Sequence, residues 1–242
     1  MEIWAHRGCH GYDKLLENTL PAFQRAIDDG VDGIELDVHI SADGVPFVFH
    51  DDCLRRLSVG GRRAPVAALG MSDLRSVILQ GGNTIPSLDE VLHLIGEKVA
   101  VNIELKNAAA VEPVATVLKR RRVENALISS FEPAAVRAAS VILPQCERAW
   151  ISGDVTGYVG RDLANWYPED QLLSVKATRW HTHIRQARRA LVMRLASRGI
   201  PTFVWTVNDT VTCRDLALRG VAGVFSDEPT RLRREFAGEP RG

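Results

Sequence analysis

Charged or aromatic residues follow five short β-rich runs of the chain, at positions suited to metal or phosphate chemistry. The five segments are Ala5-His6-Arg7-Gly8, Glu35-Leu36-Asp37, His50-Asp51, Glu104-Leu105-Lys106 and Trp205-Thr206-Val207-Asn208. Burying a charge costs free energy unless the charge is paired, so charges at the ends of buried strands need a reason. We therefore expect strands whose C-terminal ends point at one shared site.

Three acidic residues are the candidate metal ligands. Glu35 and Asp37 are two positions apart on a predicted strand, so their side chains share a face, ~6.6 Å apart along it. Glu104 ends the next barrel strand and supplies a third carboxylate. Such hard oxygen donors suit Mg²⁺ or Ca²⁺ better than Zn²⁺. Each acid alone could simply end a strand in solvent or pair with a base, but together they favour one divalent cation.

Histidine and basic side chains accompany these acids. The ordinary pKa of the histidine side chain lies near working pH, so His6 and His50 together could serve as a general base and a general acid. Arg7 offers a planar fork for phosphate, and Lys106 offers a point charge. The formal charges of three carboxylates, one divalent cation and these two basic side chains sum to +1. Such a site would accept one phosphodiester.

The alternation of strand-like and helix-like segments predicts an α/β fold, a (β/α)₈ TIM barrel with a parallel sheet. The predicted strands are Ile3–His6, Gly33–Val38, Val99–Leu105, Ala126–Ser130, Arg148–Ile151, Leu172–Val175, Thr202–Val207 and Gly223–Ser226. The predicted helices are Thr19–Gly30, Leu88–Ile95, Val111–Arg121, Pro133–Ser140, Asp154–Trp166, Ile184–Arg198 and Thr210–Leu218. The structural alternative is a doubly wound open sheet, but no G-x-G-x-x-G follows the first strand.

One segment interrupts the alternation. Asp43-Gly44 is a turn signal between the β-rich runs Glu35–Ile40 and Val45–His50, which predicts a hairpin. Folding the chain there places Asp37 roughly opposite His50 and returns His50 to the barrel mouth. The segment from residue 51 to about residue 85 is too long for an ordinary loop, so we expect it to form a small insertion over the site. We treat 1–242 as a single barrel domain carrying this insertion.

Composition narrows the class of protein. The chain of 242 residues has 30 basic and 30 acidic residues, which argues against nucleic acid or an anionic membrane as the main partner. Four cysteines form no C-x-x-C pair, which fits a reducing compartment. The sequence has neither a signal-peptide pattern nor an apolar run long enough to span a bilayer. We expect a cytoplasmic protein without stable membrane insertion. A homo-oligomer is possible on this sequence and is left open.

The ordered motifs resemble those of the glycerophosphodiester phosphodiesterase family over roughly Ile3 to Pro229. They are His6-Arg7-Gly8, Glu17-Asn18-Thr19, Ala22-Phe23, Glu35-Leu36-Asp37-Val38, Asp43-Gly44, His50-Asp51, Ile85-Pro86-Ser87-Leu88, Glu104-Leu105-Lys106, Ser130-Phe131, Trp205-Thr206-Val207-Asn208 and Ser226-Asp227-Glu228-Pro229. Any one tripeptide is weak evidence, whereas the ordered set is specific. The resemblance implies a barrel with an insertion after strand two, and hydrolysis of glycerophosphodiesters to sn-glycerol 3-phosphate and an alcohol.

The resemblance also implies roles by position. It implies that Glu35, Asp37 and Glu104 hold the cation, that His6 and His50 form the acid–base pair, and that Arg7 and Lys106 bind phosphate. Glu17 would lie at the rim, where its carboxylate could hold Arg7 or reach the metal. Trp205 would either pack in the core or form an apolar wall for the glycerol carbons. His10 and the predicted βα-loop at 176–183 depart from the family pattern and could contact the site.

Two other functions stay open on the same fold. One is a lysophospholipase D-type phosphodiesterase acting on lysophospholipids, which an apolar groove around Val66–Leu69 and Met71 would favour. The other is a barrel that binds phosphodiesters without turning them over, against which the two histidines and three acids argue. The alcohol group, the native cation and the oligomeric state are not indicated by the sequence.

Overall fold

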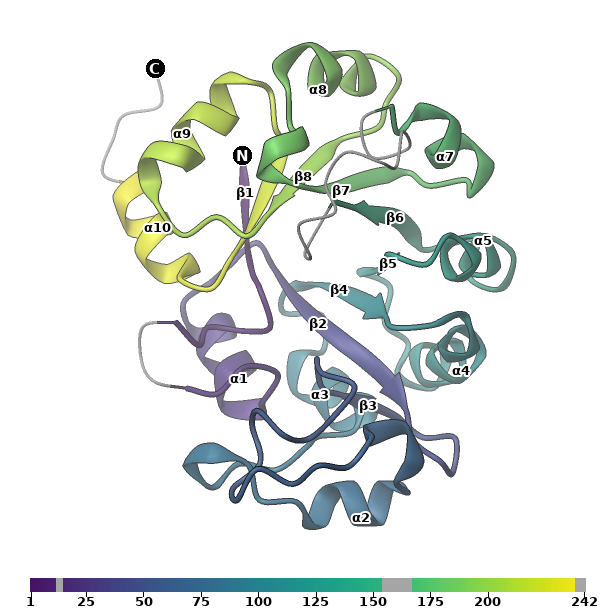
Figure 1. Ribbon diagram of the computed structural model, residues 1–242. Helices are drawn as coiled ribbons and strands as arrows, with labels where there is room; N and C mark the ends of the chain where they lie inside the picture. The colour runs from purple at the N-terminus through teal and green to yellow at the C-terminus, as the bar shows by residue number, and fades with distance from the viewer. Residues whose placement is uncertain (12–14, 154–166, 238–242) are drawn as a thin grey trace.

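Eight parallel strands close into a barrel in the computed structural model, which describes residues 1–11, 15–153 and 167–237 (Figure 1). The barrel strands are β1 (Glu2–Ala5), β2 (Gly33–Ile40), β4 (Ala100–Leu105), β5 (Ala126–Ser130), β6 (Glu147–Ser152), β7 (Arg179–His183), β8 (Thr202–Trp205) and β9 (Gly223–Ser226). Strand β1 pairs in parallel with both β2 and β9, and this pairing closes the sheet. The prediction of a TIM barrel is confirmed, and the open sheet is excluded.

Helices surround the sheet and cover its outer face (Figure 1). They are α1 (Leu20–Asp28), α3 (Leu88–Ile95), α4 (Val111–Arg121), α5 (Pro133–Ile142), α7 (Glu169–Ser174), α8 (Arg189–Ala196), α9 (Thr210–Leu218) and α10 (Pro229–Ala237), with short 3₁₀ turns η3 (Ala108–Ala110) and η4 (Ile184–Gln186). Helix α3 begins with a capping box, in which the Ser87 hydroxyl accepts from the Glu90 N–H and Glu90 accepts from the Ser87 N–H. None of the helices described is long and apolar enough to cross a membrane.

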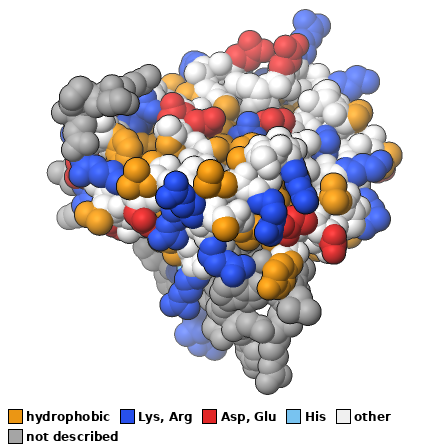
Figure 2. Space-filling model, turned by 90° about the horizontal axis from the view of Figure 1, so that it is seen from above, with side chains coloured by type: hydrophobic (Ala, Val, Ile, Leu, Met, Phe, Trp, Pro, Cys, Tyr) orange, Lys and Arg blue, Asp and Glu red, His pale blue; other side chains and the backbone are white. Residues whose placement is uncertain are grey.

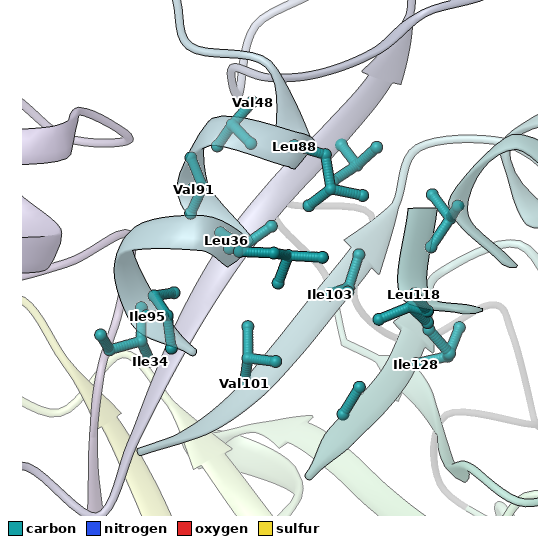
Figure 3. Packing of buried hydrophobic residues seen from close by; sticks show 14 of the residues in the cluster. Ile34, Leu36, Val48, Leu88, Val91, Ile95, Val101, Ile103, Leu118 and Ile128 are labelled. Carbon is teal, nitrogen blue, oxygen red and sulfur yellow. The ribbon is translucent and has the colours of Figure 1, made fainter. Parts of the chain in front are cut away.

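Strand alternation sends the acidic residues inward. Figure 3 shows Leu36 of β2 and Ile103 of β4 packed towards α3, which contributes Leu88 and its neighbours. Because successive strand residues point to opposite faces, the intervening Glu35 and Glu104 face the barrel interior. The outward-facing apolar residues of these strands therefore form the helix–sheet core, and the inward-facing polar residues form the site.

The predicted hairpin is present, displaced by one residue. Strand β3 (Pro46–Val48) runs antiparallel to β2, with Val38 opposite Val48. The Phe49 N–H donates to the Asp37 carbonyl at 3.0 Å, so Phe49 faces Asp37 and His50 lies one position further along. The expected return of the chain to the barrel mouth is confirmed.

The segment after the hairpin has an apolar core of its own. It contains the 3₁₀ turns η1 (Val66–Ala68) and η2 (Gln80–Gly82) and the helix α2 (Met71–Ser76). Its buried side chains are Phe47, Phe49, Leu54, Leu57, Val66, Met71, Leu74, Val77, Leu79 and Ile85, with Leu69 packed against them. Val66 and Met71 thus pack inside the insertion rather than lining a groove. The division of the chain into domains stays a prediction.

One predicted strand is wrong. Leu172–Val175 covers the end of α7 and the residue after it, and the barrel strand is β7, inside the stretch at 176–183 that we expected to be a loop. A four-residue apolar run cannot distinguish a strand from a buried helical turn. Strand β7 alternates charged or imidazole residues with Trp180 and Thr182, and this pattern does not resemble a buried strand. The predicted helix Asp154–Trp166 lies outside the described residues.

Charges of both signs are mixed on the outer surface. Figure 2 shows basic and acidic side chains beside one another on one face, with scattered hydrophobic side chains between them. Within the basic run at 119–122, Arg120 donates to Asp89 of α3 at 2.6 Å and Arg121 pairs with the same carboxylate. Pairing of this kind belongs to a solvated helix face.

Candidate active site

The C-terminal ends of the barrel strands enclose a cavity of ≈ 320 Å³. Its lining comprises His6, Arg7, Glu35, His50, Asn102, Glu104, Phe131, Ile151, His181, Trp205, Thr206 and Phe225. Asp37 and Lys106 lie behind this lining, in contact with each other, and Glu17 is connected to the cavity through Arg7. The site residues predicted from the sequence are therefore brought together at the barrel mouth, where barrel enzymes carry their active sites. Their catalytic and binding roles stay predictions.

The three acids form one cluster. Carboxylate oxygens of Glu35, Asp37 and Glu104 lie within 4.8 Å of one another, because the β2–β4 register sets Asp37 beside Glu104. Burial, together with the charges of Asp37 and Glu104, raises the pKa of Glu35 well above its ordinary value. Three crowded carboxylates, two of them buried, form the hard oxygen set that Mg²⁺ and Ca²⁺ prefer. The residues present fit such a cation.

Two cationic side chains hold Asp37 in its anionic form. Lys106 Nζ lies 2.6 Å from one Asp37 oxygen and 2.5 Å from Glu104 Oε1, and Arg7 Nε lies 3.3 Å from the other Asp37 oxygen. Asn18 donates to that second oxygen at 2.7 Å. Burial alone would raise the pKa of Asp37, but the charges of Lys106 and Arg7 outweigh burial and hold it below its ordinary value.

The Arg7 backbone adopts a left-handed conformation that aims it at the acids. Its φ is +57°, and its N–H donates to Glu35 Oε2 at 3.0 Å. The next residue, Gly8, has φ +86°, and a Cβ there would lie 2.9 Å from Ala22 of α1. Glycine is required at this position both for its positive φ and for the close approach of the helix.

Glu17 joins the mouth of the barrel to the insertion. Its carboxylate accepts from Arg7 Nη1 at 3.0 Å and from two nitrogens of Arg56 at 2.7 Å each. Arg56 also donates to Asp51 at 2.7 Å. The expected contact between Glu17 and Arg7 is present. Arg56 was not predicted from the sequence, because it lies in an arginine-rich segment with no motif that distinguishes it from its neighbours.

Both candidate catalytic histidines are held by carboxylates. Nδ1 of His6 lies 2.7 Å from Asp227 Oδ1, and Nδ1 of His50 lies 2.7 Å from Asp51 Oδ1. A carboxylate on one ring nitrogen orients the imidazole and fixes which nitrogen faces the cavity. Asp227 is itself fixed by Asn208, whose amide donates to Asp227 Oδ2 at 2.9 Å.

Aromatic residues form the apolar side of the cavity. Trp205 and Phe131 meet edge to face with ring centroids 5.7 Å apart, and both line the cavity. Trp205 also packs against the inner aromatic cluster that contains Trp4 and Phe203. The two roles expected for Trp205, core packing and cavity wall, are therefore compatible in this geometry.

His181 is a buried, neutral imidazole in the cavity lining. Its ring contacts Phe203 and Phe225, with centroids 5.5 and 4.9 Å away. Burial, with a smaller contribution from Arg179, lowers the pKa of His181 well below its ordinary value of 6.5. His181 was expected to contact the site from a loop, whereas it lies on strand β7 and lines the cavity.

This shift predicts a loss of stability on the acid side. Below pH 6.5 the unfolded chain binds a proton at His181 that the folded chain excludes, so the free energy of unfolding falls as pH drops. His181→Phe should remove this dependence, so between pH 7.5 and 5.5 the variant should lose less stability than wild type, by about 1 kcal/mol. Urea unfolding of both proteins at pH 7.5 and 5.5 measures the difference. Equal acid sensitivity of wild type and variant would contradict the assignment.

A closed barrel whose mouth carries an acid cluster and two carboxylate-held histidines has the architecture of a barrel enzyme. The chain belongs to the glycerophosphoryl diester phosphodiesterase family, whose model matches residues 6–231. It is 31% identical to a glycerophosphodiester phosphodiesterase of Bacillus altitudinis, across 95% of this chain and 96% of the relative. The resemblance seen in the sequence motifs is confirmed, and the protein is a phosphoric diester hydrolase.

Two further comparisons bear on fold and substrate. A phosphodiesterase of Oleispira antarctica, solved with its product sn-glycerol-3-phosphate, has the same fold at a TM-score of 0.87, with 24% identity and coverage of 98% of this chain and 97% of that chain. A human lysophospholipase D is 26% identical across 95% of this chain and 84% of its own length. The relatives of this chain are thus named for two different substrate classes.

Proposed function

We propose that this enzyme hydrolyses glycerophosphodiesters to sn-glycerol 3-phosphate and an alcohol, using one divalent cation and two histidines. The observation that carries the proposal is the convergence of the Glu35 cluster with His6 and His50 on one cavity. Each histidine is oriented by its own carboxylate, and the acids supply oxygen donors for a cation. Cytoplasmic location stays a prediction from the sequence, and a homo-oligomer stays open.

Glu35, Asp37 and Glu104 would hold Mg²⁺ or Ca²⁺. When bound there, the cation supplies Lewis-acid activation of a phosphate oxygen and lowers the pKa of a hydroxyl. Arg7 and Lys106 adjoin the acids, so their charges can also neutralise the phosphodiester. The acids, the cation and these two basic side chains sum to +1, which balances one phosphodiester charge.

His6 and His50 would move the protons. One histidine accepts the proton of the attacking glycerol hydroxyl as its oxygen bonds to phosphorus. The other donates a proton to the leaving alkoxide as the bond from phosphorus to that oxygen breaks. The product is a cyclic phosphate, which water opens with the two proton-transfer roles exchanged. Direct attack by water on the diester is the competing route.

Product analysis with controlled cations tests the proposal. The purified enzyme should release sn-glycerol 3-phosphate from glycerophosphocholine, lose this activity in EDTA, and regain it when Mg²⁺ or Ca²⁺ is added. A cyclic glycerophosphate should appear before the final product. Activity that survives complete chelation would contradict metal dependence. Incorporation of solvent ¹⁸O in one inverting step, without a cyclic species, would favour direct attack by water.

Lysophospholipids are the second candidate substrate class. The apolar lining contributed by Phe131 and Trp205, together with the name of the human relative, favours testing them. A cavity of ≈ 320 Å³ lies at the lower end of ligand pockets, which favours a small substrate. Lysophosphatidylcholine should therefore be cleaved more slowly than glycerophosphocholine in the same assay. Tight binding of either compound without release of product would support the non-catalytic barrel instead.

A further inference from the structure

A second cluster of metal-binding side chains lies beside the first. His6 and His10 follow β1, and Asp227 follows the neighbouring strand β9. We propose that these three residues form a Zn²⁺ site, separate from the carboxylate cluster, and that zinc bound there inhibits the enzyme. The inhibitory half of the proposal rests on the proposed acid–base role of His6, whereas the zinc site itself does not.

The donor atoms already face one point. His6 Nδ1 and His10 Nε2 lie 2.7 and 3.3 Å from the same oxygen of Asp227, and the three donors lie within 4.8 Å of one another. Tetrahedral zinc with bonds of about 2.1 Å places its ligands roughly 3.4 Å apart. Adjustments of about 1 Å or less in the side chains would therefore complete the coordination.

The surroundings meet the other requirements of a metal site. Asn208 donates to the second oxygen of Asp227 and accepts the Asp227 N–H, both at 2.9 Å, so the carboxylate is fixed by an outer hydrogen bond. The side chains of His6, His10 and Asp227 are 17%, 19% and 28% exposed, so the cluster lies near the surface of the barrel mouth. Within the described part of the chain, His10 Nε2 is enclosed and makes no well-directed hydrogen bond.

Ligand chemistry separates the two sites. Two imidazoles and one carboxylate suit Zn²⁺, whereas the three carboxylates around Glu35 suit Mg²⁺ or Ca²⁺. Zinc at low concentration should therefore enter the His6 cluster while Mg²⁺ stays on the acids.

Zinc on His6 would remove its lone pair from catalysis. The imidazole would bind through Nδ1, so the neutral ring would keep its proton on Nε2, and any second proton would pass to solvent on binding. The ring would then have no free nitrogen to accept a proton from substrate. Two nitrogen–metal bonds and one oxygen–metal bond form, and no redox step is involved.

Zinc binding to the Mg²⁺-loaded protein tests the site directly. Equilibrium dialysis should show one bound Zn²⁺ in wild type, and His10→Gln should weaken this binding by about 10²-fold or more, beyond the effect of losing an outer-shell contact. His93→Gln is the matched control, because His93 is an exposed histidine of α3 outside the cluster. Equal zinc affinity of wild type and His10→Gln would overturn the site.

Activity under the same zinc titration tests the inhibition. Wild type and His93→Gln should lose activity as the site fills, whereas His10→Gln should keep its basal rate and need about 10²-fold more zinc for inhibition. Zinc displacing Mg²⁺ from the carboxylates would instead inhibit all three proteins alike, and this result overturns the proposal. Full zinc occupancy with unchanged activity would preserve the site and contradict the acid–base role of His6.

Discussion

Replacing His50 with alanine is expected to lower kcat by about 10²- to 10⁴-fold, the usual contribution of a positioned acid or base. His50 lines the cavity, and Asp51 holds its Nδ1 at 2.7 Å, so the ring is oriented before substrate arrives. Because the proton is transferred only in the transition state, KM should change little. Steady-state kinetics on glycerophosphocholine with saturating Mg²⁺ measure both constants.

The matched control for this change is His93→Ala. It makes the same substitution at an exposed histidine outside the cavity, so kcat should be unchanged. A loss below tenfold for His50→Ala would mean that the acid–base pair is misassigned. His6→Ala combined with His50→Ala should cost little more than either change alone, because groups acting as one unit are not additive.

The barrel was predictable because its signals are local. Each strand that places an acid in the site also carries apolar residues that alternate with the acids and pack in the helix–sheet core. Leu36 lies between Glu35 and Asp37 in this way, and Ile103 lies beside Glu104. The turn at Asp43-Gly44 returned the chain to the mouth as expected, and the one-residue displacement reflects a register that turn chemistry alone does not determine. Strand β7 was missed because its inward face carries imidazole and guanidinium groups.

Apart from the contact between Glu17 and Arg7, the ion-pair network of the site could not be predicted, because it depends on long-range contacts. His6 and Asp227 are separated by 221 positions and meet only because β1 and β9 close the barrel. Asp227 lies in a motif quoted for the family, but nothing in that motif identifies its partner. Arg56 joins Glu17 and Asp51 from within the insertion. Only the folded insertion brings these groups together.

Glu35→Gln is expected to remove both the dependence on a divalent cation and most of the activity. A glutamine keeps an oxygen that can accept the Arg7 N–H, now 3.0 Å from Glu35 Oε2, so the local backbone should be preserved. It removes one of three carboxylates from the cation site. Because a bound metal contributes several kcal/mol to transition-state stabilisation, the loss should be about 10³-fold or more. Glu97→Gln, on an exposed turn, is the control.

Without a metal, the stability of Glu35→Gln should not fall with its activity. Burial and the neighbouring charges of Asp37 and Glu104 raise the pKa of Glu35, so its ionisation costs folding free energy as pH rises above 4.5. Glu35→Gln should therefore unfold in EDTA at pH 7 at an equal or higher urea concentration than wild type. Adding Mg²⁺ or Ca²⁺ should raise the Tm of wild type by mass action and leave that of the variant unchanged.

A variant that keeps the cation-induced rise in Tm would show that Glu35 is not a ligand. A variant with lower stability in EDTA would show that its activity loss reflects damage to the fold.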